Sequence, residues 1–198
     1  MAILAPSSFT ARNGAHVVLR SAAPGDARAV TAFKRAALLQ SDYLNTLPGE
    51  YGGDVGAEKA AIRQAGQADN AVMLVAEAGG GLAGLVETKA EAQRRRAHNI
   101  LMGIMVGEEW RGQGIGRALI ERLLDWARRH PRLERLNLSV HAGNAPALAL
   151  YRDLGFVEEG RRRAAIRYED GKYMDEICMC AYLGGPYSPL SPSDRHGP

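Results

Sequence analysis

The feature that most constrains this chain is an apolar run that ends in a glycine-rich turn and continues as an amphipathic helix. The run "HNILMGIMVG" occupies 98–107, the turn "RGQGIG" occupies 111–116, and the helical pattern fills 114–129. Glycine weakens regular structure, so three glycines within five residues at a helix entrance indicate a backbone that must approach another group closely. The pattern predicts a strand–turn–helix unit with a ligand site at the start of the helix.

Apolar periodicity predicts the remaining elements of a mixed α/β domain. Because most strand-like runs follow one another in hairpins, the sheet should be mostly antiparallel, with one parallel pair joined by a helical crossover. That pair is expected between 98–107 and 135–141. The other expected elements are a strand at 16–20, hairpins at 71–90 and 156–183, and helices near 26–39, 55–67 and 144–155.

The chain of 198 residues is long enough for one domain with flanking tails. We expect a flexible tail over 1–15, a single domain over 16–183, and a disordered tail over 184–198, where proline, glycine and serine dominate. No apolar run is long enough to span a membrane, so a cytoplasmic protein without membrane contact is expected.

Charge and cysteine content argue against several classes of protein. The net charge of +3 is too small to indicate nucleic-acid binding, and the arginine runs lack the interleaved aromatic residues of a strand-binding surface. Cys178 and Cys180 stand two apart, which is not a metal-ligand spacing, and no histidine accompanies them. We therefore expect two buried thiols in a reducing compartment and no metal site.

The helix entrance at the glycines fits an anion such as a phosphate. The first N–H groups of a helix have no internal partner and carry a partial positive charge. Arg111 and Arg117 could add charge-assisted hydrogen bonds of about 1.5–3 kcal/mol each. A P-loop is excluded because no lysine follows the glycines, and G-x-G-x-G does not match the dinucleotide fingerprint G-x-G-x-x-G.

Two motifs together resemble the GNAT superfamily of acyl-CoA-dependent N-acetyltransferases. "WRGQGIGRALIERLLDWA" resembles the loop and helix that bind the pyrophosphate in that family, and "NAPALALYRDLGFVEEG" resembles its second signature. The later half looks most like the branch that acetylates ribosomal-protein N-termini, amino acids or other small amines. The second signature matches at Asn144, Ala147, Leu150, Tyr151, Gly155 and Phe156.

The resemblance implies a GNAT-type sheet with helices on both faces and acetyl-CoA in the gap of a splayed parallel strand pair. The pantetheine arm would pair with the main chain near Ile104, Met105 and Val106, and Asn144 would contact the same arm. The pyrophosphate would lie on the loop formed by Arg111, Gly112, Gln113, Gly114, Ile115, Gly116 and Arg117.

The reaction that the resemblance implies is attack of an amine on the thioester carbonyl, with Tyr151 as the general acid. Asn144 and Tyr151 are seven residues apart, so they share one face of a helix. Tyrosine has a pKa of about 10 and an alkyl thiol about 8.5, so full proton transfer would be uphill by roughly 2 kcal/mol. Tyr151 could instead only pack the core. An oxyanion could be held by backbone N–H near Val106.

The general base is open among Glu87, His98 and ordered water. An α-amine with a pKa of about 8 is partly neutral at pH 7, whereas a lysine-like amine must lose a proton at about 4.6 kcal/mol. A strong base is therefore needed only for a lysine-like acceptor. As an alternative to the role of base, Glu87 could be a solvated residue of its strand.

The acceptor is expected to be a small-molecule amine or a protein N-terminus, and a homodimer is possible for this family. The irregular stretch 40–54 should border the acceptor pocket, where Glu50 or Asp54 could meet a cationic substrate or face water. Two other functions remain open: a non-catalytic module that binds or senses acyl-CoA, and a nucleic-acid binder that uses the arginine runs.

Overall fold

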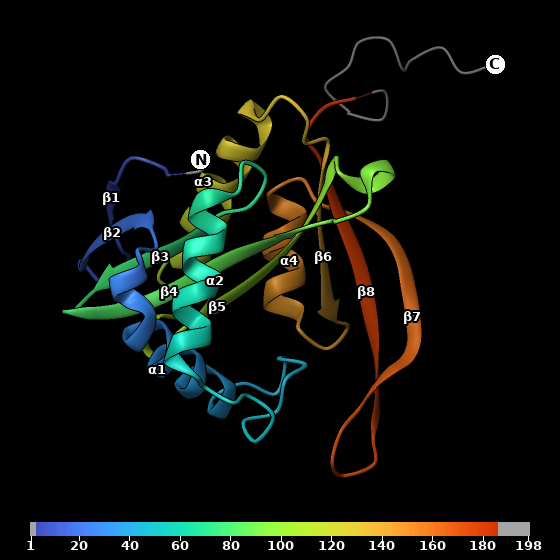
Figure 1. The fold of residues 1–198 in the computed structure, drawn as a ribbon. Coiled ribbons are helices and arrows are strands. Elements are labelled where there is room, and N and C mark those ends of the chain that lie inside the picture. Colours follow the sequence, from blue (N-terminus) through green and yellow to red (C-terminus); the bar gives the residue numbers. More distant parts are fainter. Residues whose placement is uncertain (1–2, 186–198) are drawn as a thin grey trace. The chain divides into compact units, whose positions relative to one another are not determined.

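The helices and strands of this computed structural model, which describes residues 3–185, follow the predicted order closely. Their bounds are β1 Ser7–Thr10, β2 His16–Ser21, α1 Ala27–Leu39, α2 Val55–Gln67, β3 Met73–Ala78, β4 Gly81–Ala90, β5 Asn99–Val106, α3 Ile115–Arg129, β6 Arg135–His141, α4 Ala145–Asp153, β7 Val157–Arg167 and β8 Tyr173–Tyr182. Short 3-10 turns occupy Pro24–Asp26 (η1), Arg94–Arg96 (η2) and Glu108–Trp110 (η3). Figure 1 shows these elements along the chain.

The chain divides into two compact units, and the elements β5 and α3 each contribute to both. The first unit comprises the residues up to Lys89 together with Gly103–Leu123, and the second comprises Ala90–Met102 with the residues from Leu124 onward.

In the first unit, the strand order is β1-β2-β3-β4, followed by the end of β5. Strands β1 to β4 pair antiparallel in sequence. Strand β1 lies within the range 1–15 that we expected to be a tail, and its four residues pair with β2. The predicted tail at 184–198 falls mostly outside the described residues.

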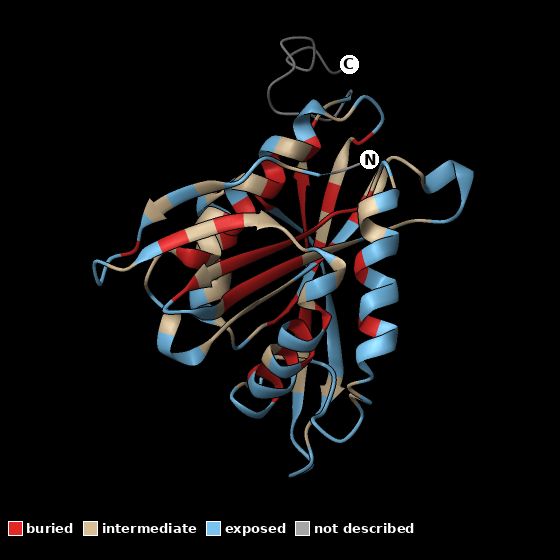
Figure 2. Ribbon diagram, turned by 60° about the vertical axis from the view of Figure 1, so that its left-hand side comes forward, coloured by how far each residue is buried: buried red, intermediate tan, exposed pale blue. Residues whose placement is uncertain are grey.

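Helices cover both faces of β4 in the first unit. Leu85 points to the face covered by α1 and α2, where it packs with Val30, Ile62 and Val75. Its neighbour Gly84 points to the opposite face, and a Cβ there would come within 2.9 Å of Ile115 and of Leu119 on α3. Only glycine lets α3 approach so closely. Figure 2 shows the long buried stretches of the strands and the exposed outer surfaces of the helices.

In the second unit, the start of β5 is followed by β6, β8 and β7. The pair β5–β6 is parallel, as predicted, and its register covers only Asn99–Leu101 against Arg135–Asn137, as in a splayed pair. The pairs β6–β8 and β8–β7 are antiparallel. The Asp-Gly turn predicted between β7 and β8 is confirmed, with Gly171 at φ +83°. The mixed, mostly antiparallel α/β fold that the sequence predicts is therefore confirmed.

The fold gives no indication of a membrane-spanning segment in the part of the chain that the structure describes. None of the helices between residues 3 and 185 combines the length and the apolar character required to cross a bilayer. Cys180 is buried and Cys178 is half-buried, and both are free thiols.

Candidate functional site

The glycine loop, defined as residues 111–116, links η3 to α3 in the first unit. Gly112 and Gly114 have φ angles of +74° and +93°, a backbone conformation that glycine adopts without strain. A Cβ on Gly112 would meet nothing within 4 Å, so the protein itself does not crowd the loop there. Glycine at that position thus serves the turn and leaves open space above it.

Backbone donors without an acceptor in the described residues gather at the start of α3, as an anion site requires. Among residues 3–185, no hydrogen-bond acceptor meets the N–H groups of Gly114, Ile115 or Gly116. Two residues further on, the N–H of Ala118 donates to the carbonyl of Gly114. These three groups lie where the helix has its partial positive charge, so they fit a phosphate oxygen.

The turn between β1 and β2 supports the glycine loop from a distant part of the sequence. Arg12 donates from its backbone N–H to the carbonyl of Gln113 at 3.3 Å and from Nη1 to the carbonyl of Gly112 at 3.2 Å. Oε1 of the Gln113 side chain is buried and has no hydrogen-bond partner within the described part of the chain. Such an orphaned acceptor is costly, so the loop contains one polar group that a ligand or water could satisfy.

The two arginines expected to assist the anion have other partners nearby. Arg111 donates from Nη2 to the carbonyl of Gln40, at the C-terminal end of α1, at 2.9 Å. Arg117 forms an ion pair with Glu121 one turn further along α3, at 3.7 Å. Arg111 therefore joins the loop to α1, which the sequence did not predict.

The end of β5 presents the predicted pantetheine-binding residues. Ile104, Met105 and Val106 are half-buried and lie beyond Leu101, where the register with β6 ends. The strand is held to β4 just after these residues, because the N–H of Gly107 donates to the carbonyl of Ala83 at 3.0 Å.

Helix α4 of the second unit carries Asn144 and Tyr151. Asn144 caps the helix, as predicted, because its Oδ1 accepts the N–H of Ala147 at 3.3 Å. Tyr151 is only 7% exposed, and its ring packs against Phe156 with centroids 5.7 Å apart. Burial raises the pKa of Tyr151 to about 12. Proton transfer to a thiolate with a pKa of about 8.5 would therefore be uphill by roughly 5 kcal/mol, more than the sequence suggested.

Glu87 belongs to a buried ionic cluster in the first unit that the sequence did not predict. The Lys34 cluster consists of Lys34 on α1, Glu58 on α2, Glu87 on β4 and Tyr51 from the loop before α2. Nζ of Lys34 donates to Oε1 of Glu58 at 3.0 Å and to Oε2 of Glu87 at 2.8 Å. The hydroxyl of Tyr51 donates to Oε2 of Glu58 at 3.0 Å.

Charge compensation explains why these groups tolerate burial. Burial alone would lower the pKa of Lys34, but the charges and hydrogen bonds of Glu87 and Glu58 raise it above its ordinary value. Removing one partner of a buried pair leaves an uncompensated charge, which typically destabilises a protein by about 3–5 kcal/mol. A sequence signal existed, since Lys34 and Glu58 share helix faces with the apolar residues Val30 and Ile62.

The other candidate polar residues serve local structure. Glu50 accepts the N–H of Leu47 at 2.8 Å through Oε2. Asp54 caps α2 by accepting the N–H groups of Gly56 and Ala57. In the second unit, the backbone carbonyl of His98 accepts the N–H groups of Glu134 and Arg135. Within residues 3–185, no group of three or more His, Cys, Asp or Glu side chains could hold a metal ion.

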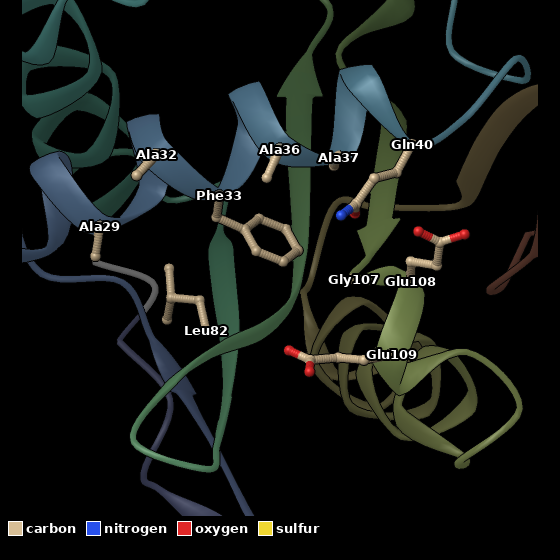
Figure 3. A pocket seen from close by; sticks show the side chains of 10 residues that line it. All are labelled: Ala29, Ala32, Phe33, Ala36, Ala37, Gln40, Leu82, Gly107, Glu108 and Glu109. Atoms are coloured by element: carbon tan, nitrogen blue, oxygen red, sulfur yellow. The ribbon is translucent and has the colours of Figure 1, made fainter.

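A groove of about 640 Å³, which no sequence pattern predicted, runs along α1 in the first unit. Figure 3 shows the ring of Phe33 and the carboxylate of Glu109 facing this groove from opposite sides. Its far wall, Gly107–Glu109, directly precedes the glycine loop. The lining residues are Ala29, Ala32, Phe33, Ala36, Ala37, Gln40, Leu82, Gly107, Glu108 and Glu109.

Family comparison agrees with the loop geometry. The model of the acetyltransferase (GNAT) family matches residues 38–156, so the chain belongs to this family. The L-amino acid N-acetyltransferase AaaT of Escherichia coli (strain K12) is 32% identical over 107 residues, which cover 54% of this chain and 65% of the relative. The ribosomal protein bS18-alanine N-acetyltransferase of the same organism is 42% identical over 79 residues, covering 40% and 52%. The chain thus spans less than two thirds of these curated relatives.

Solved structures extend the likeness over most of the chain. A GNAT-family acetyltransferase from Streptococcus pneumoniae superposes with a TM-score of 0.81 and 28% identity, covering 85% of this chain and 99% of that one. YncA from Salmonella typhimurium, solved with its cofactor acetyl-CoA, has a TM-score of 0.77 and 21% identity, covering 87% and 97%. At that identity the second likeness supports the fold alone.

Proposed function

We propose that this protein transfers the acetyl group of acetyl-CoA to a primary amine. The observation that carries the proposal is the set of N–H groups at Gly114, Ile115 and Gly116 that no acceptor within the described residues meets, beside the open space at Gly112. Membership of the acetyltransferase (GNAT) family supports the same assignment. The two relatives named for L-amino acids and ribosomal-protein alanine are both N-acetyltransferases, which supports an amine acceptor here.

Most of the contacts that would hold acetyl-CoA come from main-chain groups. We assign the pyrophosphate to the N–H groups of the glycine loop and the pantetheine arm to the main chain of Ile104 and Val106. Asn144 uses its oxygen as a helix cap, so only its Nδ2 is available to a ligand. Bound acetyl-CoA supplies an acyl group activated as a thioester.

Chemistry at the thioester requires one group that accepts a proton and one that donates a proton. As the amine nitrogen bonds to the acyl carbon, the nitrogen becomes positively charged and releases a proton, for which we propose Glu87 as the acceptor. When the C–S bond breaks, the electron pair stays on sulfur, and Tyr151 donates a hydrogen bond or its proton there. With its pKa raised to about 12, Tyr151 acts chiefly as a hydrogen-bond donor that stabilises the developing thiolate.

A screen of acetyl transfer tests the proposal. Release of free coenzyme A would be followed across amino acids, polyamines, aminoglycosides and N-terminal peptides, and we expect turnover with at least one of these classes. Binding of acetyl-CoA without turnover across the panel would instead support a non-catalytic sensing module.

A glycine substitution tests the loop itself. Gly114→Ala places a side chain at φ +93° beside the free N–H groups, so we expect acetyl-CoA to bind about tenfold more weakly, measured by calorimetry. Gly66→Ala is the matched control, since a Cβ on that α2 residue meets nothing within 4 Å. Equal affinity in both variants would remove the glycine loop from the cofactor site.

A further inference from the structure

We propose that Lys34 is a positioning residue, whose buried ammonium holds Glu87 so that one carboxylate oxygen faces the acceptor amine. The inference rests on the proposed function and deepens it, because it assigns a role to a lysine outside both sequence motifs. It also predicts that acceptors dock as amines next to a carboxylate whose geometry is fixed before they arrive.

Hydrogen bonding in the Lys34 cluster leaves a single vacant acceptor. Both oxygens of Glu58 are engaged, Oε1 by Lys34 and Oε2 by the hydroxyl of Tyr51. Oε2 of Glu87 accepts from Lys34 at 2.8 Å. No group within the described residues donates to Oε1 of Glu87. Within the described residues, Oε1 of Glu87 is therefore the one carboxylate oxygen of the cluster that has no hydrogen-bond donor.

Exposure shows on which side that donor would arrive. The side chains of Lys34 and Glu58 are 10% and 7% exposed, whereas that of Glu87 is 39% exposed. The cluster is thus sealed around the ammonium and open at Glu87. Of the three charged groups, Glu87 is thus the one that a small molecule can reach without disturbing the buried ion pair.

The charge of the cluster favours an amine. Two carboxylates share one ammonium, so the three charged groups together carry a net charge of −1. A nitrogen that attacks a thioester gains positive charge as its new bond forms, and a nearby negative charge stabilises it. An incoming carboxylate would be repelled, so the cluster discriminates by charge as well as by position.

The position of Glu87 connects the cluster to the predicted acyl-binding strand. A Cβ built on Gly103 of β5 would lie 4.0 Å from Cγ of Glu87. Gly103 directly precedes Ile104, to which we assign the pantetheine arm. Because Gly103 has no side chain, nothing from that residue covers Glu87.

Tyr51 extends the cluster into the irregular loop that precedes α2. Its hydroxyl donates to Glu58, which in turn fixes Lys34. Burial and the charge of Glu58 raise the pKa of Tyr51, so the hydroxyl remains a donor at neutral pH. The loop that we expect to border the acceptor pocket is therefore tied to the residue that orients Glu87.

A double-mutant cycle tests whether Lys34 acts through Glu87. Lys34→Met removes the charge and keeps the length, and we expect kcat to fall about tenfold while KM for acetyl-CoA stays within about twofold. In the Glu87→Gln background, the same substitution should change kcat by less than about twofold, because its target is already absent. Lys59→Met, at an exposed position on α2, is the matched control and should leave kcat unchanged.

Rescue by a conservative variant separates positioning from packing. Lys34 contacts Glu87 directly, whereas Glu58 bonds Lys34 and Tyr51 bonds Glu58. Lys34→Arg keeps the charge that orients Glu87, so it should recover most of the kcat that Lys34→Met loses. If Lys34→Met unfolds below the assay temperature, Glu58→Gln takes its place in the cycle, with an expected loss of two- to fivefold.

Each outcome decides between the two proposals. Equal losses from Lys34→Met in the wild-type and Glu87→Gln backgrounds would overturn the positioning role while leaving the acetyltransferase proposal intact. A wild-type protein that releases no coenzyme A with any amine would overturn the proposed function and this inference with it. Non-additive losses together with recovery of kcat in Lys34→Arg support both.

Discussion

Tyr151 and Glu87, the two residues proposed to handle protons, are held by opposite physical means. Tyr151 lies on α4 of the second unit, in apolar surroundings that keep it neutral and raise its pKa to about 12. Glu87 lies on β4 of the first unit, partly exposed and paired with a buried ammonium. Desolvation thus keeps the proposed proton donor protonated, whereas a fixed opposite charge orients the proposed proton acceptor.

This difference shows how one chain can supply an acid and a base at the same pH. A neutral phenol needs only exclusion of water, which a helix packed on a core provides. A carboxylate needs water or a counter-charge to stay ionised, and the Lys34 cluster supplies the counter-charge. The two environments should therefore respond differently to substitution, pH and choice of acceptor.

Removal of the Tyr151 hydroxyl should give the largest effect. We expect Tyr151→Phe to lower kcat by about a hundredfold or more, because general acid assistance typically contributes 10²–10⁴-fold. KM for acetyl-CoA should change by less than about threefold. Steady-state kinetics would measure both, with Tyr173→Phe, at a tyrosine that is 60% exposed, as the matched control. Unchanged turnover would remove Tyr151 from the chemistry.

Alkaline pH should weaken the fold through the same buried phenol. The folded-state pKa of Tyr151, about 12, lies above the ordinary value of 10, so its contribution to stability is intact below about pH 10 and is lost as the pH rises toward 12. The loss is about 1.4 kcal/mol by pH 11 and rises toward roughly 3 kcal/mol. Urea unfolding at about pH 8 and 11 would measure the free energy of unfolding. This free energy should fall more between the two pH values in the wild type than in Tyr151→Phe. Parallel declines would contradict burial of the hydroxyl.

Substitution of Glu87 should have a smaller effect that depends on the acceptor. With a lysine-like amine, whose deprotonation at pH 7 requires about 4.6 kcal/mol, we expect Glu87→Gln to lower kcat/KM about tenfold. With an α-amine, kcat/KM should fall only two- to threefold, because a fraction of the α-amine is already neutral at pH 7. Glu77→Gln, a glutamate on β3 paired with Arg20, is a control outside the cluster. Equal losses for both acceptors would argue against Glu87 as the proton acceptor.

Local sequence patterns were sufficient to predict most of the fold. The glycine loop, the α4 cap at Asn144 and the Asp-Gly hairpin at Gly171 depend on residues close together in the chain, where turn and cap preferences act directly. The parallel pair followed from the handedness and length of a helical crossover. The residues proposed for the cofactor site were named from the same local motifs.

The Lys34 cluster could not be predicted in the same way because its members are distant in sequence. Lys34 lies 24 residues from Glu58 and 53 from Glu87, and only packing of α1 and α2 on β4 brings them together. Strand β1 was also missed, since its four residues gain their order by pairing with β2. The position of Lys34 on an otherwise apolar helix face indicated a buried charge, but it did not indicate which residues would pair with it.

Arg12 has a consequence for any shortened version of the protein. Its two hydrogen bonds fix the carbonyls of Gly112 and Gln113 before any nucleotide-bearing ligand arrives. A chain trimmed to begin at His16 would retain every recognisable motif but lack this external tether. Binding of the ligand would then also have to order the glycine loop, which costs free energy. Truncated proteins would therefore bind the ligand more weakly than the intact protein does.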